Sequence, residues 1–268
     1  MRPDLHAHAR PPREAVNLSL ALFRRTIGAK YRKSYFGYLW ILIPALLITA
    51  GVWLANRSGV IDPGVTPLPY PLFVLVGVLI WQVFAEAIEV PYRAIEGARS
   101  YLTRVMFPRE AILLVQIYEG SINLVVRFVF ASLLTLLFHD SGVTGHLLLL
   151  LAFLTAFGLA IGIGLFLAPF MILFADLQNT MRLLLTYGIF LTPAFYVPSG
   201  GLFGSLVDWN PVAPSMRLAR DGLAGLPVAS DPGLAWAMGC AVVLCAAGVV
   251  FIKGAVPHLV ERMLLGGR

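Results

Sequence analysis

A polar stripe interrupts the apolar stretch between residues 111 and 138, and it is the first place where the sequence could do chemistry. Its four members follow one another at spacings of three, four and four residues, which puts them on one face of a helix. They are Gln116, Glu119, Asn123 and Arg127. Amide, carboxylate and guanidinium groups in this arrangement could line a polar conduit and hydrogen-bond a hydrophilic cargo.

The same stripe has a second interpretation, in which its charged side chains form ion pairs within the protein. A charge inside a membrane costs several kcal/mol unless it is paired or hydrated. Arg127 could pair with Glu119, or with Glu86 and Glu89 of the preceding apolar stretch. The sequence leaves both interpretations open, and both could hold in different states.

Motifs for other kinds of chemistry are missing from the sequence. There is no Gly-x4-Gly-Lys-Ser/Thr loop and none of the three lysines follows a glycine, so this cradle for ATP phosphates is absent. There is no Gly-x-Ser-x-Gly elbow, and the five histidines and two cysteines form no cluster with metal-ligand spacing. We therefore predict no catalytic residue, no metal site and no cofactor in this chain. If ATP drives the protein, ATP and Mg²⁺ bind a separate partner subunit.

Aromatic side chains offer one further chemical role. Most Trp and Tyr residues lie near the ends of apolar stretches, where they typically anchor helices in the membrane interface. A minority could stack against sugar rings. Trp40, Tyr70 and Trp81, together with Glu86, complete the candidate channel residues that begin with the polar stripe.

The elements that must position these residues are apolar helices. Apolar residues make up 59% of the 268-residue chain and charged residues only 13%, whereas soluble domains average about 25% charged residues. Six apolar stretches stand out, and most reach the roughly 20 residues that span a bilayer. They cover residues 36–55, 68–90, 111–138, 146–174, 183–197 and 234–256. The sequence predicts an all-α, polytopic membrane protein with six transmembrane helices.

Positive charges predict how these helices are oriented. With six spans both termini share a side, and the segments on that side hold sixteen Lys and Arg against three on the other. Because cytoplasmic segments are enriched in Lys and Arg, we place both termini in the cytoplasm. The predicted organisation is a cytoplasmic tail over residues 1–35, one transmembrane domain over 36–256 and a second tail over 257–268. In the fourth stretch, Gly158 and Gly162 favour close helix packing.

The tail over residues 1–35 contains an amphipathic helix. Apolar residues recur on one face at spacings of three and four, namely Val16, Leu20, Phe23, Ile27 and Tyr31. Basic residues occupy the other faces, so we expect the helix to lie in the cytoplasmic membrane interface. Packing on a partner protein is the alternative.

Two segments between spans are also more apolar than ordinary connections. Residues 91–110 mix charged with apolar side chains and could form a short helix that presents an apolar edge to another protein. Residues 198–233 are predicted to lie outside, yet they are apolar and broken by Gly and Pro. Two re-entrant half-helices would explain this pattern, because non-helical backbone is tolerated at membrane depth where protein or a water-filled cavity covers it. This segment is a candidate gate.

Several motifs follow one another in order at the start of the first and second spans, in the segment over 91–110, at the outer end of the fifth span and in the outer segment over 198–233. They are Arg24-Arg25, Lys30-Tyr31-Arg32, Gly37-Tyr38-Leu39-Trp40, Tyr70-Pro71-Leu72-Phe73, Leu102-x-Arg104-Val105-x-Phe107-Pro108-Arg109, Thr192-Pro193 and Asn210-Pro211 with Arg220. Taken together, these motifs resemble the permease subunits of ABC-type polysaccharide exporters, the family that exports capsule, O-antigen and teichoic acid.

The resemblance implies a function, partners and a location. Two copies of the chain would pair with two ABC ATPase subunits and move a lipid-linked polysaccharide across the bacterial inner membrane, and periplasmic or outer-membrane export proteins could join them. No nucleic-acid partner is expected. Capsular polysaccharide is the preferred cargo; O-antigen, teichoic acid, another lipid or a drug are alternatives. A membrane-embedded transferase is the least favoured, because the sequence offers no His–Asp pair or carboxylate cluster at one membrane face.

The resemblance also implies roles for particular residues. Residues 93–107 would form a coupling helix seated on the ATPase, and residues 199–225 the outer gate. The coupling residues would be Arg93, Glu96, Arg99, Tyr101, Leu102, Arg104, Val105 and Phe107. The gate residues would be Tyr196, Trp209, Asn210, Arg217 and Arg220.

Overall fold

The computed structural model describes most of the chain and is helical wherever regular structure is found in it. It covers residues 37–97, 109–198, 209–227 and 232–265 and the single positions 19, 20, 23, 201, 204 and 207; at 38, 109–112 and 256–265 it describes the backbone alone. The elements are η1 (Gly37–Ile41), α2 (Ile43–Arg57), α3 (Tyr70–Gly97), α5 (Arg109–Phe138), α6 (Val143–Leu173), α7 (Ala175–Tyr187), η2 (Gly188–Leu191), α9 (Ala213–Leu223) and α10 (Pro232–Leu265).

Five helices within these described residues are long and apolar enough to cross a membrane. They run over Leu39–Arg57, Tyr70–Gly97, Leu113–Phe138, Val143–Leu173 and Pro232–Ala255. The prediction of an all-helical fold is therefore confirmed for these residues, and the five helices are consistent with the predicted multi-pass membrane protein. The five helices overlap five of the six predicted apolar stretches.

The remaining stretch, residues 183–197, does not form one long helix. The helix α7 begins earlier, at Ala175, and ends at Tyr187, and the short 3-10 helix η2 carries the chain to Leu191. The chain then turns at Pro193, which cannot donate a helical hydrogen bond. The 13 residues of α7 span only about 20 Å at 1.5 Å per residue, so a sixth span is not confirmed.

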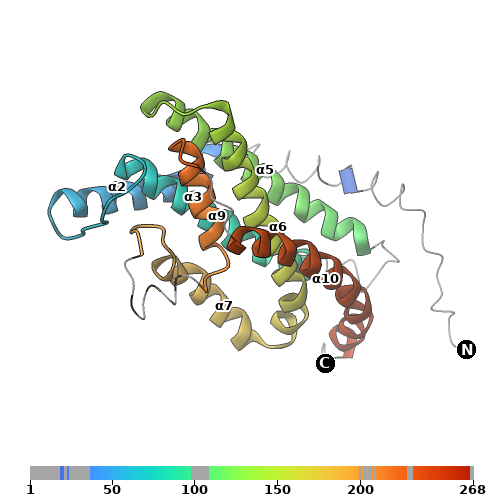
Figure 1. Ribbon diagram of the computed structural model, residues 1–268. Helices are drawn as coiled ribbons and strands as arrows, with labels where there is room; N and C mark the ends of the chain where they lie inside the picture. Colours follow the sequence, from blue (N-terminus) through green and yellow to red (C-terminus); the bar gives the residue numbers. More distant parts are fainter. Residues whose placement is uncertain are drawn as a thin grey trace, which may run out of the picture.

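The helices α3 and α6 form the centre of the fold. The α6 helix is apolar on all sides, and such a helix is stable when other helices surround it. It packs against α10, α3 and α9, and Figure 1 shows it in the middle of the molecule. In the most apolar part of α3, 78% of the residues are buried, against 17% in α2. The cavity described below thus lies against the most deeply buried of the five long helices.

Glycines bring α6 into direct backbone contact with its neighbours. A Cβ atom added to Gly164 would lie 2.3 Å from the carbonyl oxygen of Ile88 on α3, and one added to Gly162 would lie 2.7 Å from the Cβ atom of Leu244 on α10. On Gly158 it would approach the Cβ atom of Ala241 to 3.6 Å. The predicted close packing at Gly158 and Gly162 is confirmed. These contacts leave no room for a side chain at Gly162 or Gly164.

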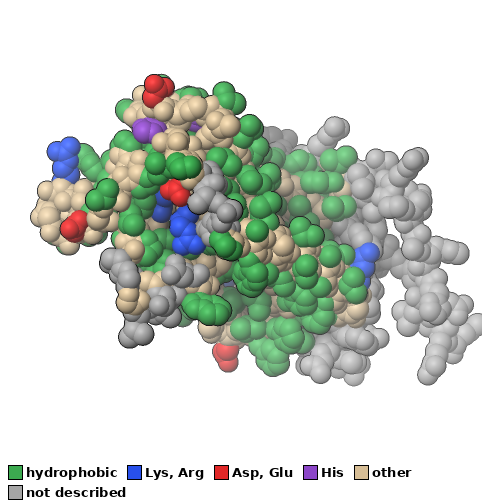
Figure 2. All heavy atoms as spheres, viewed as in Figure 1, with side chains coloured by type: hydrophobic (Ala, Val, Ile, Leu, Met, Phe, Trp, Pro, Cys, Tyr) green, Lys and Arg blue, Asp and Glu red, His purple; other side chains and the backbone are tan. Residues whose placement is uncertain are grey.

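The outer helices leave large apolar surfaces uncovered. Leu47 and Leu54 on α2, Leu137 on α5 and Val242 and Val250 on α10 are all more than half exposed. Hydrophobic side chains cover much of the face drawn in Figure 2 and charged ones are few. A surface of this kind suits contact with lipid or with another transmembrane subunit.

The contact between Gly164 and Ile88 predicts a sharp difference between two substitutions. Gly164→Ala should destabilise the protein by about 1–3 kcal/mol, because overpacking forces the backbones of α6 and α3 apart. Gly51→Ala on α2 is the matched control, since a Cβ atom there meets nothing within 4 Å. Thermal unfolding of the detergent-solubilised protein measures both. Equal midpoints for the two variants would contradict this account of the packing.

Candidate functional site

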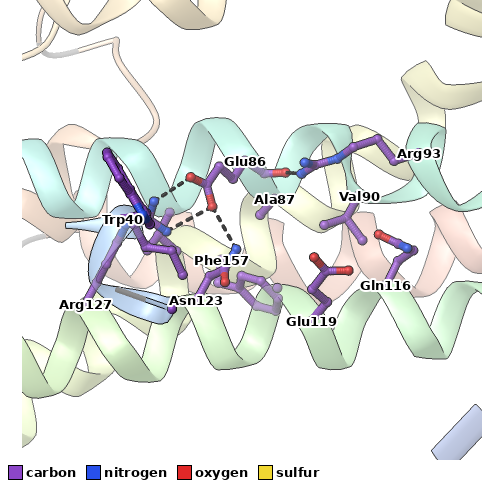
Figure 3. Close-up of a pocket in the computed structure, with 14 residues that line it drawn as sticks. Trp40, Glu86, Ala87, Val90, Arg93, Gln116, Glu119, Asn123, Arg127 and Phe157 are labelled. Carbon is purple, nitrogen blue, oxygen red and sulfur yellow. Dashed lines mark hydrogen bonds and ion pairs between the residues drawn. The ribbon is translucent and has the colours of Figure 1, made fainter. Parts of the chain in front are cut away.

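A cavity of about 420 Å³ lies between η1, α3, α5 and α6, and Figure 3 shows most of the side chains that line it. Its polar lining comes from the facing sides of α3 and α5, and its aromatic lining from η1 and α6. The lining residues are Gly37, Trp40, Ile41, Val83, Glu86, Ala87, Val90, Arg93, Gln116, Glu119, Gly120, Asn123, Arg127 and Phe157. The volume is within the range of about 300–1,000 Å³ typical of ligand pockets.

The carboxylate of Glu86 is the centre of the polar lining. Nη1 of Arg127 donates a hydrogen bond to its Oε2 atom at 2.9 Å, and Nη2 donates to Oε1. Nδ2 of Asn123 also donates to Oε2, at 3.1 Å. Figure 3 shows both donors reaching Glu86 from α5. Of the ion pairs open to Arg127, the structure forms the one with Glu86.

The pair joins a buried group to one that reaches the cavity. The side chain of Arg127 is 2% exposed and that of Glu86 is 39% exposed. An unpaired guanidinium at such a depth would cost several kcal/mol, and the two-pronged contact with Glu86 offsets part of that cost. Nε of Arg127 is buried and has no hydrogen-bond partner among the described residues. One donor is therefore left over.

Local sequence explains why the two helices approach closely here. Gly120 lies between Glu119 and Asn123 on α5, and a Cβ atom at this position would come within 3.1 Å of the Phe157 ring and 3.4 Å of Val90. The missing side chain lets α5 lie close to α3 and α6. Asn123 and Arg127, which follow Gly120 on α5, are thereby brought within hydrogen-bond distance of Glu86.

Arg93 closes the predicted cytoplasmic end of the cavity. Its Nη2 atom donates to the backbone carbonyl of Glu86 at 2.8 Å, and its Nε atom lies 4.0 Å from a carboxylate oxygen of Glu89. Pro91, inside α3, has no N–H and leaves the carbonyl four residues earlier without its helical partner. That carbonyl belongs to Ala87, and Arg93 donates to the carbonyl of the residue before it.

Six of the eight predicted channel residues line this cavity, and their part in transport stays a prediction. They are Trp40, Glu86, Gln116, Glu119, Asn123 and Arg127. Val83, Ala87 and Phe157 also line it and were not predicted from the sequence. Apolar residues inside apolar stretches carry no distinguishing signal, so only the helix packing could identify these three.

Tyr70 and Trp81, the other two predicted channel residues, are not part of the cavity lining. The Tyr70 hydroxyl donates to the carbonyl of Phe195 at 3.0 Å, and Nε1 of Trp81 donates to the carbonyl of Leu185 at 3.1 Å. A Cβ atom on Gly188 would lie 2.9 Å from the Trp81 ring. Both side chains tie α3 to the segment that contains α7 and η2.

Arg220 holds together the predicted gate region. It lies on α9, a short helix with nine of its eleven residues buried, and is itself 3% exposed. Its guanidinium donates hydrogen bonds to the carbonyls of Phe73, Pro193 and Ala194 at 2.6–3.1 Å. It also lies over the Phe73 ring, 3.5 Å from the centroid.

The charge and the space for Arg220 both depend on its surroundings. Burial lowers the pKa of the Arg220 guanidinium to about 9, so the group still carries its charge at neutral pH. Gly77 provides the space, because a Cβ atom there would lie 2.3 Å from Nη2 of Arg220. Three carbonyl acceptors satisfy the cation without a carboxylate. This arrangement fixes α9 and the turn at Pro193 to the amino-terminal end of α3.

The other predicted gate residues have separate environments. Oδ1 of Asn210 accepts a hydrogen bond from the backbone N–H of Val212 at 2.9 Å and so supports the start of α9. Trp209 is 87% exposed, Tyr196 and Arg217 are half-buried, and the N–H of Val197 donates to Pro63 in the loop after α2 at 3.1 Å. Their proposed role in gating is not tested by these contacts.

Part of the predicted coupling region and of the tail lies outside the described residues. Among the coupling residues, Arg93 and Glu96 are on α3, which continues past Pro91 to Gly97. The rest lie outside: Arg99, Tyr101, Leu102, Arg104, Val105 and Phe107. In the predicted amphipathic tail helix, the Phe23 ring contacts Tyr118 of α5 edge-on, with centroids 5.6 Å apart. At the other end, α10 continues to Leu265, beyond the boundary predicted at residue 256.

The potential metal ligands of the described residues lie apart from one another. No group of three or more His, Cys, Asp and Glu side chains is assembled there in a way that could hold a metal ion. Glu86 and Glu119, the two carboxylates of the cavity, share it with two guanidinium groups and two amides. The arrangement can therefore donate and accept hydrogen bonds.

Comparison with known proteins places the chain beside export permeases. No protein-family model matches the sequence. The chain is 28% identical over 184 residues to the O-antigen export system permease protein RfbA of Myxococcus xanthus, covering 67% of this chain and 68% of that protein. It is 26% identical over 213 residues to the polysialic acid transport protein KpsM of Escherichia coli, covering 76% and 80% respectively.

The ion pair predicts a non-additive response to substitution. Glu86→Gln should destabilise the protein, because it leaves the buried Arg127 without its counter-charge. The loss of such a partner costs roughly 3–5 kcal/mol when both groups are buried, which is an upper bound here because Glu86 is partly exposed. Adding Arg127→Met should recover part of that loss. Thermal unfolding of both variants and of Arg127→Met alone completes the cycle, and purely additive effects would argue against a coupled pair.

The carbonyl cage around Arg220 predicts a loss of stability even with a conservative change. Arg220→Lys keeps the charge, but one ammonium group cannot reach carbonyls on two sides as a planar guanidinium does. Unsatisfied buried carbonyls cost about 1–3 kcal/mol each, so the thermal midpoint should fall by roughly 5 °C or more. Arg57→Lys is the control, since that residue lies exposed beside Trp53. If both variants melt alike, the cage does not stabilise the fold.

Proposed function

We propose that this relative of the permease subunits of ABC-type polysaccharide exporters is the membrane subunit of an ATP-driven exporter of a lipid-linked polysaccharide. The observation that carries the proposal is its similarity to permeases of two polysaccharide transport systems over two thirds or more of the chain. The polar cavity inside an apolar bundle adds support, because polar groups at such depth typically mark a transport pathway.

The membrane topology needed for this function includes a sixth span made of α7 and η2 together. The 13 residues of α7 and the four of η2 would extend about 28 Å at the helical rises of about 1.5 and 2.0 Å per residue, close to the roughly 30 Å of hydrocarbon. Leu183, Leu184 and Phe190 are more than half exposed. With this span both termini lie in the cytoplasm, in agreement with the positive-charge bias.

A second copy of the chain completes the membrane domain in this proposal. No residue of α7 is buried, and Asn179, Thr180 and Thr186 on it are exposed. Polar side chains in a span avoid lipid and face protein or a water-filled cavity. A partner permease facing α7 would cover these groups, and the space between the two copies would form the conduit for the polymer.

An ABC ATPase supplies the energy and binds at the predicted cytoplasmic end of α3. The helix carries Arg93 and Glu96 directly into the segment over residues 91–110, so force applied to that segment would reach the cavity wall along α3. At the opposite end, the segment anchored by Arg220 is the proposed outer gate. Periplasmic and outer-membrane proteins would receive the polymer there.

Capsular polysaccharide is the preferred cargo, and O-antigen is the second candidate. The similarity to the polysialic acid transport protein covers more of the chain, whereas the similarity to the O-antigen permease has the higher identity. The names of both relatives refer to the transport of a polysaccharide. The two candidate cargoes therefore differ in the sugar polymer and not in the kind of transport.

Disruption of the gene tests the proposed function directly. We expect the disrupted strain to lose one class of surface polysaccharide and to accumulate that polymer in the cytoplasm, because its synthesis continues without export. Staining of surface capsule, separation of O-antigen by electrophoresis and assay of the cytoplasmic fraction distinguish the candidate cargoes. Complementation with the intact gene is the control. Unchanged surface polysaccharide of every class would refute the proposal.

A further inference from the structure

The helix α7 joins two firmly held parts of the structure without being buried itself. It follows the central helix α6 after one extended residue, Phe174, and η2 connects it to the turn that Arg220 anchors at Pro193. No residue of α7 is buried, and Figure 1 shows the helix at the edge of the molecule. The orientation of α7 is therefore set by a few contacts and not by a packed apolar face.

Trp81 of α3 contacts α7 at the point where this helix ends. Its Nε1 atom donates to the carbonyl of Leu185 at 3.1 Å, and a Cβ atom on Gly188 would lie 2.9 Å from its ring. In a continuing α-helix the Leu185 carbonyl would accept from the N–H of Ile189. Because α7 ends at Tyr187, this carbonyl lies at a helix end, where helical partners are missing. Trp81 supplies the donor instead.

A change of η2 from a 3-10 helix to an α-helix would rotate α7 about its axis. Each residue turns the chain by about 120° in a 3-10 helix and by about 100° in an α-helix. Over the four residues of η2 the difference amounts to about 80°, while the length changes by only about 2 Å. Since Arg220 fixes the turn that follows η2, the rotation would appear in α7. A 3-10 stretch within a helix often marks a functional hinge.

Two features of the structure oppose this conversion. The side chain of Trp81 is bonded to the Leu185 carbonyl and lies against Gly188 at the start of η2. The side chain of Ile189, which is buried, would have to leave its site. An energy source is therefore required to turn α7, and ATP hydrolysis by a partner subunit would supply it.

We propose that η2 is a rotary joint used in the transport cycle and that Trp81 is the stop that fixes α7 in the orientation described here. When Trp81 releases Leu185, that carbonyl bonds to the N–H of Ile189, η2 becomes α-helical and α7 turns. The turn moves the exposed polar side chains of α7, among them Asn179 and Thr180, to another side of the helix. The proposal rests on the function proposed above, in which α7 faces a second permease across the conduit.

Cysteine reactivity along α7 measures the rotation. Single cysteines replace exposed residues in turn, at positions 179, 180, 183, 184, 186 and 187, in a chain that still exports after Cys240 and Cys245 are replaced by alanine. The probe is a charged methanethiosulfonate reagent, added to membranes that contain the permease with its ATPase. With ATP and vanadate, the reactive positions should shift around the helix by roughly 80°. The same reactive positions in both states would overturn the proposal.

Trp81→Phe tests the stop without nucleotide. The variant keeps an aromatic ring but loses the N–H that bonds to Leu185, so the positions of the shifted set should gain reactivity about fivefold, the factor that corresponds to one hydrogen bond. Trp53→Phe on α2 is the matched control, because Trp53 is partly exposed and contacts Arg57. If Trp81→Phe shows the same pattern as Trp53→Phe, the proposal fails. Should Trp81→Phe not accumulate in the membrane, the comparison of the two nucleotide states decides.

Export separates a failure of the joint from a failure of the proposed function. Trp81→Phe should lower surface polysaccharide while ATP hydrolysis by the exporter continues, whereas Trp53→Phe should export normally. If gene disruption abolishes export but the reactive positions on α7 never shift, the joint is wrong and the proposed function stands. If disruption has no effect on any surface polysaccharide, the proposed function fails. The comparison of Trp81→Phe with Trp53→Phe needs no ATP and still tests the joint.

Discussion

The contact between Glu86 and Arg127 determines how the polar half of this structure can be built. An ionised side chain inside apolar helices must find a partner, since the cost of leaving it unpaired exceeds a substantial part of the stability of a folded domain. Arg127 is buried on α5 and reaches across to α3 for its counter-charge. The two helices must therefore keep one rotation relative to each other. Gly120 makes this possible by allowing a close approach, and the cavity exists because that geometry is fixed.

A second buried cation, Arg220, lies at the predicted outer end of the molecule. Its partners are not carboxylates but the carbonyl oxygens of Phe73, Pro193 and Ala194. Carbonyl groups in a turn, such as those of Pro193 and Ala194, lack helical partners and are open to an external donor, and a carbonyl inside a helix, such as that of Phe73, has a second lone pair that can accept as well. One guanidinium thereby joins three chain segments. The Glu86–Arg127 pair connects two helices, whereas Arg220 anchors a turn and a short helix.

Hydropathy and helical periodicity were sufficient to predict most of the fold. The long stretches that became α2, α3, α5, α6 and α10 are continuous apolar runs, and the polar stripe on α5 follows the helical repeat. The stretch over residues 183–197 does not coincide with one helix, because α7 begins earlier, at Ala175, and Gly188 and Pro193 lie within the stretch. The partner of Arg127 depended on how α3 and α5 rotate against each other. The partners of Arg220 are backbone carbonyls, which every residue carries, so a sequence pattern cannot identify them.

The length of α10 has a consequence for the surroundings of the membrane. Its 34 residues extend about 51 Å at the rise of an α-helix, while the hydrocarbon layer is about 30 Å thick. Tilts of transmembrane helices reach about 40°, which would absorb only part of the difference. The last turns of α10 must therefore emerge into the headgroup layer and the water beyond it. They form a helical projection at the carboxyl-terminal end of α10, continuous with the part of the helix that packs against α6.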